Sequence, residues 1–574
     1  MNLAPNHKIA GLLAPVTALR GSNDLGAGDT EALKELVDWS ARHGIGMVQI
    51  LPVNEPGGDS SPYNSISSVA LDPMTIAAHP ASMRDLSAAD FHTVCARHGA
   101  ESLREGKVNF RAVRALKRDL LEAGWKKFRS SQLKEKTRRA KEFQAWTLKN
   151  ADWLQPYTLF RALVRLHGEN EVTDHWPRRQ RTYASAQKWL AAATPAQKRR
   201  VRALRDFFAY VQWIAYGQWS ALRDHAGSCG VALVGDVPVG VSLYSADVFA
   251  YPDIFDVTRC AGAPPERFFA ADPFTAKWGQ NWGFPLYAWD AMADDDYAWW
   301  RRRLRKSMEI FHALRVDHAL GFFRIYSFPW RPERNAEFLP LSEEEAKERT
   351  GGELPHFVPC DDSSVHNMET NREQGERLFR MILEETGPYR IIAEDLGELS
   401  PYVRPTLQAL HIPGFKIPQW ERTHDGWPVD GTDYERLSLA TYATHDHPSL
   451  RGYWDGWWAD TQSGDPHRAG HALRQMEELA HFARLHVPLP APWSDEIHEA
   501  LLRALFLSNS WLAVNMVTDL FGTSERFNVP GAAGDQNWTE RFPVPIDQWD
   551  ARWPEKLARF GAMLRESGRM ISKN

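Results

Sequence analysis

The sequence predicts an α/β fold, a (β/α)8 TIM barrel with large, mostly helical insertions between its strands. Short apolar runs alternate about eight times with amphipathic helical stretches along the 574 residues, which is the pattern of a parallel sheet with crossover helices. Several runs end in polar residues, as strands do where they reach the mouth of a barrel. A doubly wound open sheet is the alternative architecture, but the glycine fingerprint of its dinucleotide-binding form is absent.

Eight apolar runs are the predicted strands, and eight is the number that closes such a barrel. In chain order they are residues 10–16, 45–53, 230–241, 312–318, 389–397, 414–420, 439–447 and 511–522. Amphipathic stretches at 29–44 and 371–387 lie between them and predict helices. The first begins at Asp29, which can cap a helix, and both end at a glycine.

We expect a single catalytic barrel over residues 1–574, with two intervals that are too long for simple crossovers. Residues 75–215 separate the second and third strands and predict a helical insertion. Residues 245–300 follow the third strand and are rich in Pro, Gly, Phe and Trp. Because long loops in compact enzymes are usually functional, we expect this loop-rich insertion to form part of the cleft at the barrel mouth.

The composition excludes several classes of protein. Basic and acidic residues number 68 and 73, a formal net charge of −5, so no nucleic-acid partner is expected. No stretch approaches ~18 uninterrupted apolar residues and the N-terminus lacks a signal-peptide pattern, so no membrane association is expected. The four cysteines lie far apart in the sequence and match no metal-ligand spacing, which predicts reduced thiols in a cytoplasmic protein. They are Cys95, Cys229, Cys260 and Cys360.

No cofactor is expected from the motifs. The pair His445 and His447 could bind a metal, but a lone His-x-His without further ligands is a weak signal. The stretch 57–61 resembles a phosphate loop only in its glycines, since it lacks the lysine and the glycine spacing. The 24 tryptophans are unusual and suit a protein that stacks the flat faces of sugars or bases.

Four of the predicted strands end in a carboxylate. Asp236, Asp317, Glu394 and Asp446 follow the third, fourth, fifth and seventh strands, and the carboxyl ends of barrel strands share one mouth. Cleavage of an acetal needs one carboxylic acid to protonate the leaving oxygen and one carboxylate to face the oxocarbenium-like carbon. The set therefore favours glycoside chemistry, with retention of configuration if the second carboxylate forms a covalent sugar ester.

The neighbours of these acids suit the two roles. Arg315 and Asp317 point to the same face of an extended strand, because side chains alternate with period two, so the cation favours the ionised form of Asp317. The apolar neighbours of Glu394 are of the kind that raises a carboxyl pKa towards that of a useful acid. Asp395 points to the opposite side and is interpreted as structural.

Three of the strand-end segments resemble the catalytic segments of the 4-α-glucanotransferases called amylomaltase or disproportionating enzyme, within the α-amylase superfamily. They are "LRVDH", "IIAEDLG" and "ATHDH". The resemblance covers essentially the entire chain in family order. It includes the Ser-Pro-Tyr loop at 51–73, the third-strand segment at 235–255, the mobile loop at 261–269 with its Gly-Gln-x-Trp-Gly end at 279–290, and the closing segment at 527–542.

The resemblance implies roles for particular residues. Asp317 is implied as the nucleophile, Glu394 as the acid/base and Asp446 as a third carboxylate that binds sugar hydroxyls and steadies positive charge, while Arg315 orients Asp317. The implied substrate-binding residues surround the donor ring or line the acceptor side. They are Tyr63, Asp236, Gln280, Trp282, Arg315, His318 and His445.

The implied activity is transfer of α-1,4-glucan segments between malto-oligosaccharides by a retaining double displacement, with malto-oligosaccharides, glucose and α-1,4-glucans as partners. A retaining α-glucan hydrolase is the alternative, because it uses the same carboxylates with water as acceptor. A non-catalytic glucan-binding protein is disfavoured, because the three catalytic carboxylates and Arg315 are all present.

Departures from the family pattern concern the acceptor side. His447 and Phe284 stand where the family commonly has Asn, and the run 272–282 is longer than usual. The loop-rich insertion carries aromatic side chains that are expected to cap the cleft and stack an acceptor ring. They are Phe268, Phe269, Phe274, Trp278, Trp282 and Phe284.

Overall fold

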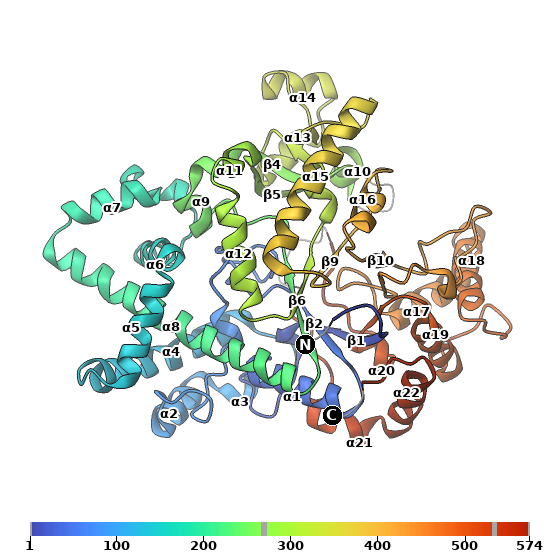
Figure 1. Cartoon of the computed structure of the whole chain (residues 1–574), viewed down its shortest axis with the longest axis horizontal. Coiled ribbons are helices and arrows are strands. Elements are labelled where there is room, and N and C mark those ends of the chain that lie inside the picture. Colours follow the sequence, from blue (N-terminus) through green and yellow to red (C-terminus); the bar gives the residue numbers. More distant parts are fainter. Residues whose placement is uncertain (1–2, 266–271, 531–535, 572–574) are drawn as a thin grey trace.

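The computed structural model describes residues 3–265, 272–530 and 536–571, and its centre is a sheet of eight parallel strands (Figure 1). The strand order is β10-β11-β12-β1-β2-β3-β6-β9. The strands are β1 (Ile9–Ala14), β2 (Met47–Ile50), β3 (Ala232–Val237), β6 (Ala313–Val316), β9 (Ile391–Ala393), β10 (Gly414–Lys416), β11 (Ser438–Ala440) and β12 (Leu512–Met516). At the remaining gap the Ala393 N–H donates to the Pro413 carbonyl at 2.9 Å, so the sheet nearly closes into a barrel. All eight predicted strands are present, and the predicted fold class is confirmed.

Side chains of alternating direction divide each strand between the barrel interior and the surrounding helices. In β12, Leu512, Val514 and Met516 belong to the interior cluster, whereas Ala513 packs in the outer core. Apolar side chains from the other strands, such as Leu13 and Val234, join this cluster, so the barrel is a packed core rather than a pore.

Long helices cross from strand to strand outside the barrel. The helix predicted at 29–44 is α1 (Thr30–Arg42), where the Asp29 side chain accepts hydrogen bonds from the first turn. The helix predicted at 371–387 is all but the first six residues of α15 (Val365–Thr386), whose C-terminal cap is Gly387. The helix before β3, α8 (Pro195–Ser228), packs against α1 and β3.

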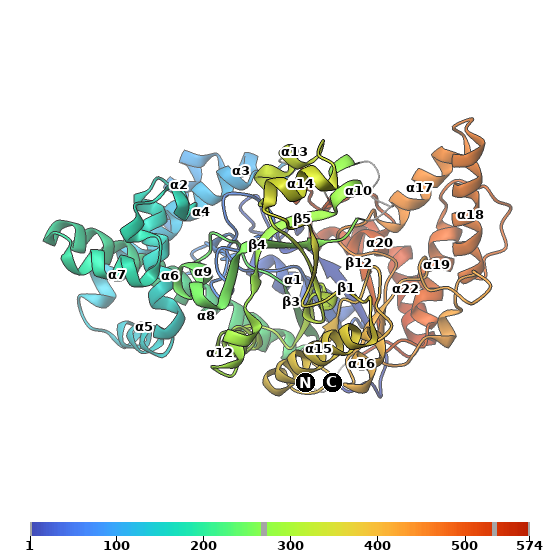
Figure 2. The same ribbon diagram turned by 90° about the horizontal axis from the view of Figure 1, so that it is seen from above.

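Helices also fill the interval predicted as a helical insertion. They are α2 (Ala88–His98), α3 (Ala100–Leu103), α4 (Phe110–Phe128), α5 (Arg138–Lys149), α6 (Ala151–Leu166), α7 (Tyr183–Ala192) and the first part of α8. Figure 2 shows this group extending from one side of the barrel, while α17 (Leu450–Thr461) and α18 (Pro466–Phe482) extend from the other.

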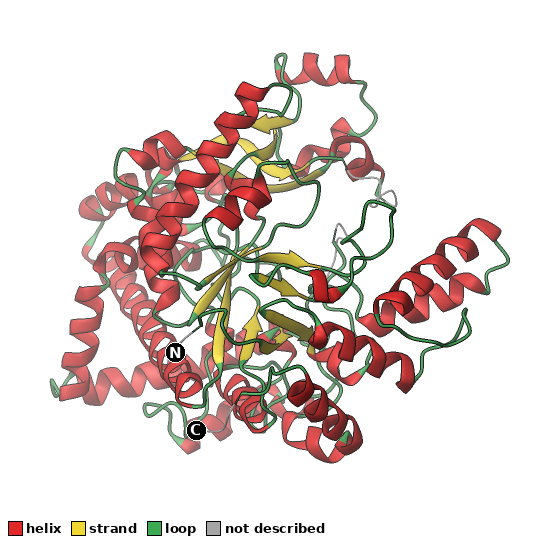
Figure 3. Ribbon diagram, turned by 45° about the vertical axis from the view of Figure 1, so that its right-hand side comes forward, coloured by secondary structure: helices red, strands yellow, loops and turns green. Residues whose placement is uncertain are grey.

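The prediction of a loop-rich segment over 245–300 is wrong in part, because two strands cross it. β4 (Phe255–Ala263) and β5 (Gln280–Tyr287) join β7 (Ile325–Phe328) and β8 (His356–Val358) in an antiparallel sheet of order β5-β4-β7-β8. Figure 3 shows this second group of strands beside the barrel. Short helices complete the segment: α9 (Ala246–Ala250), α10 (Pro273–Trp278), α11 (Trp289–Ala293) and α12 (Ala298–Met308).

The remaining helices follow the later strands. They are α13 (Asn335–Phe338), α14 (Glu343–Thr350), α16 (Val403–Ala409), α17 (Leu450–Thr461), α18 (Pro466–Phe482), α19 (Asp495–Leu507), α20 (Val517–Phe521), α21 (Trp549–Arg552) and α22 (Pro554–Glu566). Within the described ranges, no helix has both the length and the apolar character needed to cross a membrane.

Candidate active site

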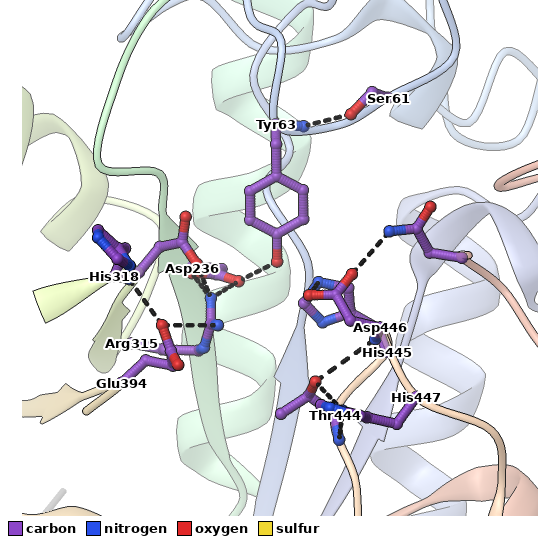
Figure 4. Close-up of polar contacts among 12 residues, drawn as sticks. Ser61, Tyr63, Asp236, Arg315, His318, Glu394, Thr444, His445, Asp446 and His447 are labelled. Carbon is purple, nitrogen blue, oxygen red and sulfur yellow. Dashed lines mark hydrogen bonds and ion pairs between the residues drawn. The ribbon is translucent and has the colours of Figure 1, made fainter. Parts of the chain in front are cut away.

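One guanidinium, that of Arg315, stands at the centre of the site formed at the carboxyl ends of β3, β6 and β9 (Figure 4). The strand register places Asp236 of β3 directly beside Arg315 of β6. Nη1 of Arg315 donates to Oδ1 and Oδ2 of Asp236 at 2.8 and 2.7 Å, and to Oδ1 of Asp317 at 2.9 Å. Nη2 lies 3.8 Å from Oε2 of Glu394. Three of the four predicted acids therefore share one cation.

Burial makes this sharing necessary. Arg315 is 3% exposed, Asp236 4% and Glu394 9%. Charges removed from water are tolerated only when they are paired and hydrogen-bonded, and the planar fork of an arginine can serve more than one carboxylate at once. The predicted pairing of Arg315 with Asp317 is confirmed, and Asp236 extends it into a network.

The Glu394 carboxyl group is buried and is held by backbone hydrogen bonds. Burial raises the pKa of Glu394 to about 8, and the nearby charge of Asp317 adds to the rise, while Arg315 opposes it. The backbone N–H groups of His318 and Leu396 donate to its two oxygens at 2.8 and 3.2 Å, which fixes the carboxyl group in place. With this raised pKa, the carboxyl group favours its protonated form at neutral pH.

The turn after β6 brings His318 between the acids and the second sheet. His318 has a φ of 43°, a left-handed conformation that is costly for a side-chain-bearing residue, and this turn points its N–H at Glu394. The Trp282 ring meets the His318 ring edge-on at 4.8 Å and stacks on Phe284 at 5.6 Å. Trp282 Nε1 donates to Oε1 of Gln280 at 3.2 Å, so both predicted acceptor-side residues of β5 reach the site.

Tyr63 connects the two halves of the site. Its hydroxyl donates to Oδ2 of Asp236 at 2.6 Å, and its ring stacks on His445 with centroids 5.1 Å apart and planes at 14°. The ring of Trp538 lies 6.0 Å from that of Tyr63 and 5.7 Å from that of His445. Stacked aromatic rings of this kind provide a surface on which a sugar ring can stack.

Asp446 occupies the far side of the site, after β11. Asn528 Nδ2 donates to its Oδ1 at 2.6 Å, and His445 Nε2 lies 3.4 Å from its Oδ2. Burial alone would raise the pKa of Asp446, but the His445 imidazole and the Asn528 amide hold it below its ordinary value. The carboxylate is therefore ionised at neutral pH.

The aromatic cap expected from the loop-rich insertion is only partly present. Phe274 and Trp278 are buried in the small core of the second sheet, where they pack on Phe328 and Trp330, so the expectation that they face the cleft is wrong. Phe268 and Phe269 lie outside the described residues. Trp282 and Phe284 remain as the aromatic surface that this insertion brings to the site.

A cavity of about 310 Å³ lies along the segment that follows β9. Its lining is Asp395, Leu396, Gly397, Leu399, Arg404, Ile417, Trp420, Glu421 and Arg422. As predicted for a structural residue, Asp395 turns away from the other acids. Its Oδ2 accepts from Arg404 Nε at 3.0 Å, and its Oδ1 accepts from the Phe415 N–H at 2.6 Å. His447 lies near the cavity, with its ring 5.1 Å from Trp420.

The predicted site residues therefore form one connected cluster: Tyr63, Asp236, Gln280, Trp282, Arg315, Asp317, His318, Glu394, His445 and Asp446. Reasoning from the sequence missed Arg526, Asn528 and Trp538. Arg526 Nη2 donates to the Asp446 carbonyl at 3.3 Å. The closing segment at 527–542 contains Asn528 and Trp538, but its resemblance marks a region without assigning a partner to Asp446, and Arg526 lies just before it.

Comparison with known proteins gives the site its context. Residues 14–546 match the model of a family described as 4-alpha-glucanotransferase. A 4-alpha-glucanotransferase of Thermus thermophilus is 28% identical, over 98% of this chain and 99% of its own length. One of Chlamydia caviae is 27% identical, over 96% of this chain and 92% of its own.

Solved structures show the same fold. The amylomaltase from Corynebacterium glutamicum superposes with a TM-score of 0.77 at 21% identity, covering 98% of this chain and 75% of that one. The amylomaltase from Streptococcus agalactiae in complex with acarbose gives 0.72 at 21% identity, covering 98% of this chain and 100% of that one. With the family match spanning residues 14–546, the chain belongs to the 4-α-glucanotransferase family.

Proposed function

We propose that this 4-α-glucanotransferase moves α-1,4-glucan segments between malto-oligosaccharides by a retaining double displacement, with Asp317 as nucleophile and Glu394 as acid/base. The observation that carries the proposal is the shared guanidinium. Arg315 holds Asp317 at 2.9 Å and lies 3.8 Å from Glu394, and the pKa of Glu394 is raised. A carboxylate paired with a cation, next to a second carboxyl group whose pKa is raised, suits the two roles that retaining glycoside chemistry requires.

In the first step, an oxygen of Asp317 attacks the anomeric carbon of the donor. The bond from that carbon to the glycosidic oxygen breaks, and Glu394 gives its proton to the departing oxygen. Because Arg315 donates to Oδ1 of Asp317, Oδ2 is the oxygen that attacks. The products are a shortened glucan and a glycosyl ester of Asp317.

In the second step, an acceptor sugar hydroxyl attacks the same carbon. Glu394, now ionised, takes the hydroxyl proton, and the bond to Asp317 breaks. Asp446, whose pKa is held low, supplies negative charge beside the developing oxocarbenium ion. The Tyr63 and His445 rings support the donor sugar, since stacked aromatic faces suit a pyranose ring.

Transfer rather than hydrolysis depends on the acceptor side. A positioned hydroxyl can gain an effective molarity of ~10⁵ M or more over a freely diffusing one, so an acceptor held at the ester can outcompete water. Trp282, Gln280 and His318 are the residues proposed to hold it. Cytoplasmic action is part of the proposal, supported by the four free cysteines.

Incubation with maltotriose alone tests the proposed function. Transfer yields glucose together with maltopentaose and longer chains, while the number of reducing ends stays nearly constant. A hydrolase instead raises the number of reducing ends in step with the loss of maltotriose. Separation of the products combined with a reducing-end assay distinguishes the two, and the second outcome would overturn the proposal in favour of the hydrolase.

A further inference from the structure

Three side chains with metal-binding atoms meet where α1 and α8 end. Asp38 lies on α1, His225 in the last turn of α8, and Cys229 at its C-terminal cap. Cys229 Sγ lies 3.6 Å from His225 Nε2 and 3.8 Å from Asp38 Oδ1, and these last two atoms are 2.5 Å apart. Among the residues that the structure describes, no other group of three or more His, Cys, Asp and Glu side chains is as closely gathered.

The two helices fix this arrangement. His225 and Cys229 are four positions apart at the end of α8, so they face the same side. Two turns earlier along both helices, the Thr30 hydroxyl donates to Oε1 of Gln218 at 2.8 Å, which sets the register of α1 against α8. The buried stripe of α1 packs in the main core, so Asp38 is held beside the pair rather than on a free loop.

We propose that Asp38, His225 and Cys229 form a binding site for zinc that is separate from the active site. A tetrahedral zinc ion with ligand bonds of ~2.3 Å to sulfur and ~2.0–2.1 Å to nitrogen and oxygen separates S from N or O by about 3.6 Å and N from O by about 3.3 Å. The two observed distances from sulfur, 3.6 and 3.8 Å, agree with that geometry. Only the short contact between His225 and Asp38 has to open.

The types of ligand atom in the proposed site indicate which metal ion it would bind. Thiolate and imidazole ligands favour zinc and similar borderline ions, whereas Mg²⁺ and Ca²⁺ prefer oxygen ligands. On binding, the Cys229 thiol releases its proton to solvent, and His225 coordinates through the lone pair of neutral Nε2. The side chains of His225 and Asp38 are 31% and 39% exposed, so water can reach the ion and occupy the fourth position.

The site lies at the end of the barrel opposite the catalytic acids. α1 and α8 end just before β2 and β3 begin, whereas Asp236 and Asp317 lie at the carboxyl ends of their strands. A bound ion therefore joins the ends of two helices and stabilises the folded chain. The expectation that the cysteines match no metal-ligand spacing did not consider the pair His225 and Cys229. Asp38 lies 187 positions from His225, so no local sequence pattern could place it beside them.

Cobalt is the direct probe, because a thiolate bound to tetrahedral Co²⁺ gives a near-ultraviolet charge-transfer band. The full-length protein is stripped with EDTA, desalted and titrated with Co²⁺. We expect one equivalent to bind with that band, and Zn²⁺ to displace it. Cys229→Ser removes the band, and His225→Gln and Asp38→Asn each weaken binding by about 10-fold or more.

Cys95→Ser is the matched control, because Cys95 is also a half-buried free thiol but belongs to no such group. We expect this variant to keep the Co²⁺ charge-transfer band and the affinity for Co²⁺. A second readout is the unfolding midpoint, which rises with Zn²⁺ in the parent and in Cys95→Ser but not in Cys229→Ser. The proposal is overturned if the parent shows no stoichiometric thiolate band, or if the band and the zinc-dependent midpoint survive in Cys229→Ser.

Discussion

At the scale of single residues, the charge balance of the site depends on Arg315. Asp236 and Asp317 both accept hydrogen bonds from the same Nη1, and Glu394 lies near Nη2. An isolated Arg-x-Asp in a strand would be an ordinary ion pair. Here it holds together three acids contributed by three strands, which links the stability of the barrel mouth to its chemistry.

Arg315→Met should therefore destabilise the fold as well as abolish transfer. The substitution leaves buried carboxylates without a cation, and breaking a buried pair in this way costs about 3–5 kcal/mol. Urea unfolding followed by circular dichroism measures the effect. Arg138→Met is the control, because Arg138 pairs with Glu142 on an exposed helix face and should change little. Equal stabilities of the two variants would contradict the assignment.

The raised pKa of Glu394 sets the basic limb of the pH profile. The first step needs the protonated form, and burial raises the pKa of Glu394 to about 8, so kcat/KM should fall as the pH rises through about 8. Rates with maltotriose across the pH range measure the limb. The Glu394→Gln variant has no acid to titrate, so its residual rate on a glycosyl fluoride should show no basic limb. A limb near the ordinary pKa of a glutamate would contradict the raised pKa of Glu394.

At the scale of elements, the second sheet shows where sequence patterns fail. β5 carries Gly283 and Pro285, which are residue types that usually indicate loops. β5 is nevertheless the edge strand, a position that tolerates proline. Gly262 of β4 allows the close approach, since a Cβ there would lie 1.9 Å from the Gln280 carbonyl oxygen. This pairing is long-range, so no local pattern predicts it.

The position of β5 makes Trp282 a test of acceptor binding. Trp282→Ala removes the ring that faces His318 and stacks on Phe284. Without these acceptor contacts, water should react with the glycosyl ester more often, so the ratio of hydrolysis to transfer should rise. The rate of donor cleavage should fall less than the rate of transfer. Product analysis with maltotriose gives both rates. Trp427→Ala is the control, because this exposed tryptophan contacts His481 away from the acids. An unchanged ratio in Trp282→Ala would count against the acceptor role.

At the scale of the whole molecule, the barrel could be predicted from the sequence because each strand has its own signal. An apolar run, a polar end and a capped helix on either side are all local, and the alternation of eight such units implies closure. The four acids at strand ends could be placed for the same reason. The partners of Asp446 could not, because Asn528 and Arg526 reach it from a segment about eighty residues later.

The division of labour between Asp317 and Glu394 is the central claim, and a glycosyl fluoride tests it directly. Fluoride leaves with little need for protonation, whereas general acid catalysis of an ordinary donor contributes ~10²–10⁴-fold. Glu394→Gln should therefore still release fluoride and accumulate a sugar ester, because no base remains to activate the acceptor. Asp317→Ala should release none.

Peptide mass analysis of Glu394→Gln after reaction with maltosyl fluoride is the decisive measurement. The account predicts a maltosyl adduct on the peptide that contains Asp317, together with fluoride release that is absent from Asp317→Ala. Equal fluoride release by both variants, or an adduct on Asp446 or Asp236 instead, would contradict it.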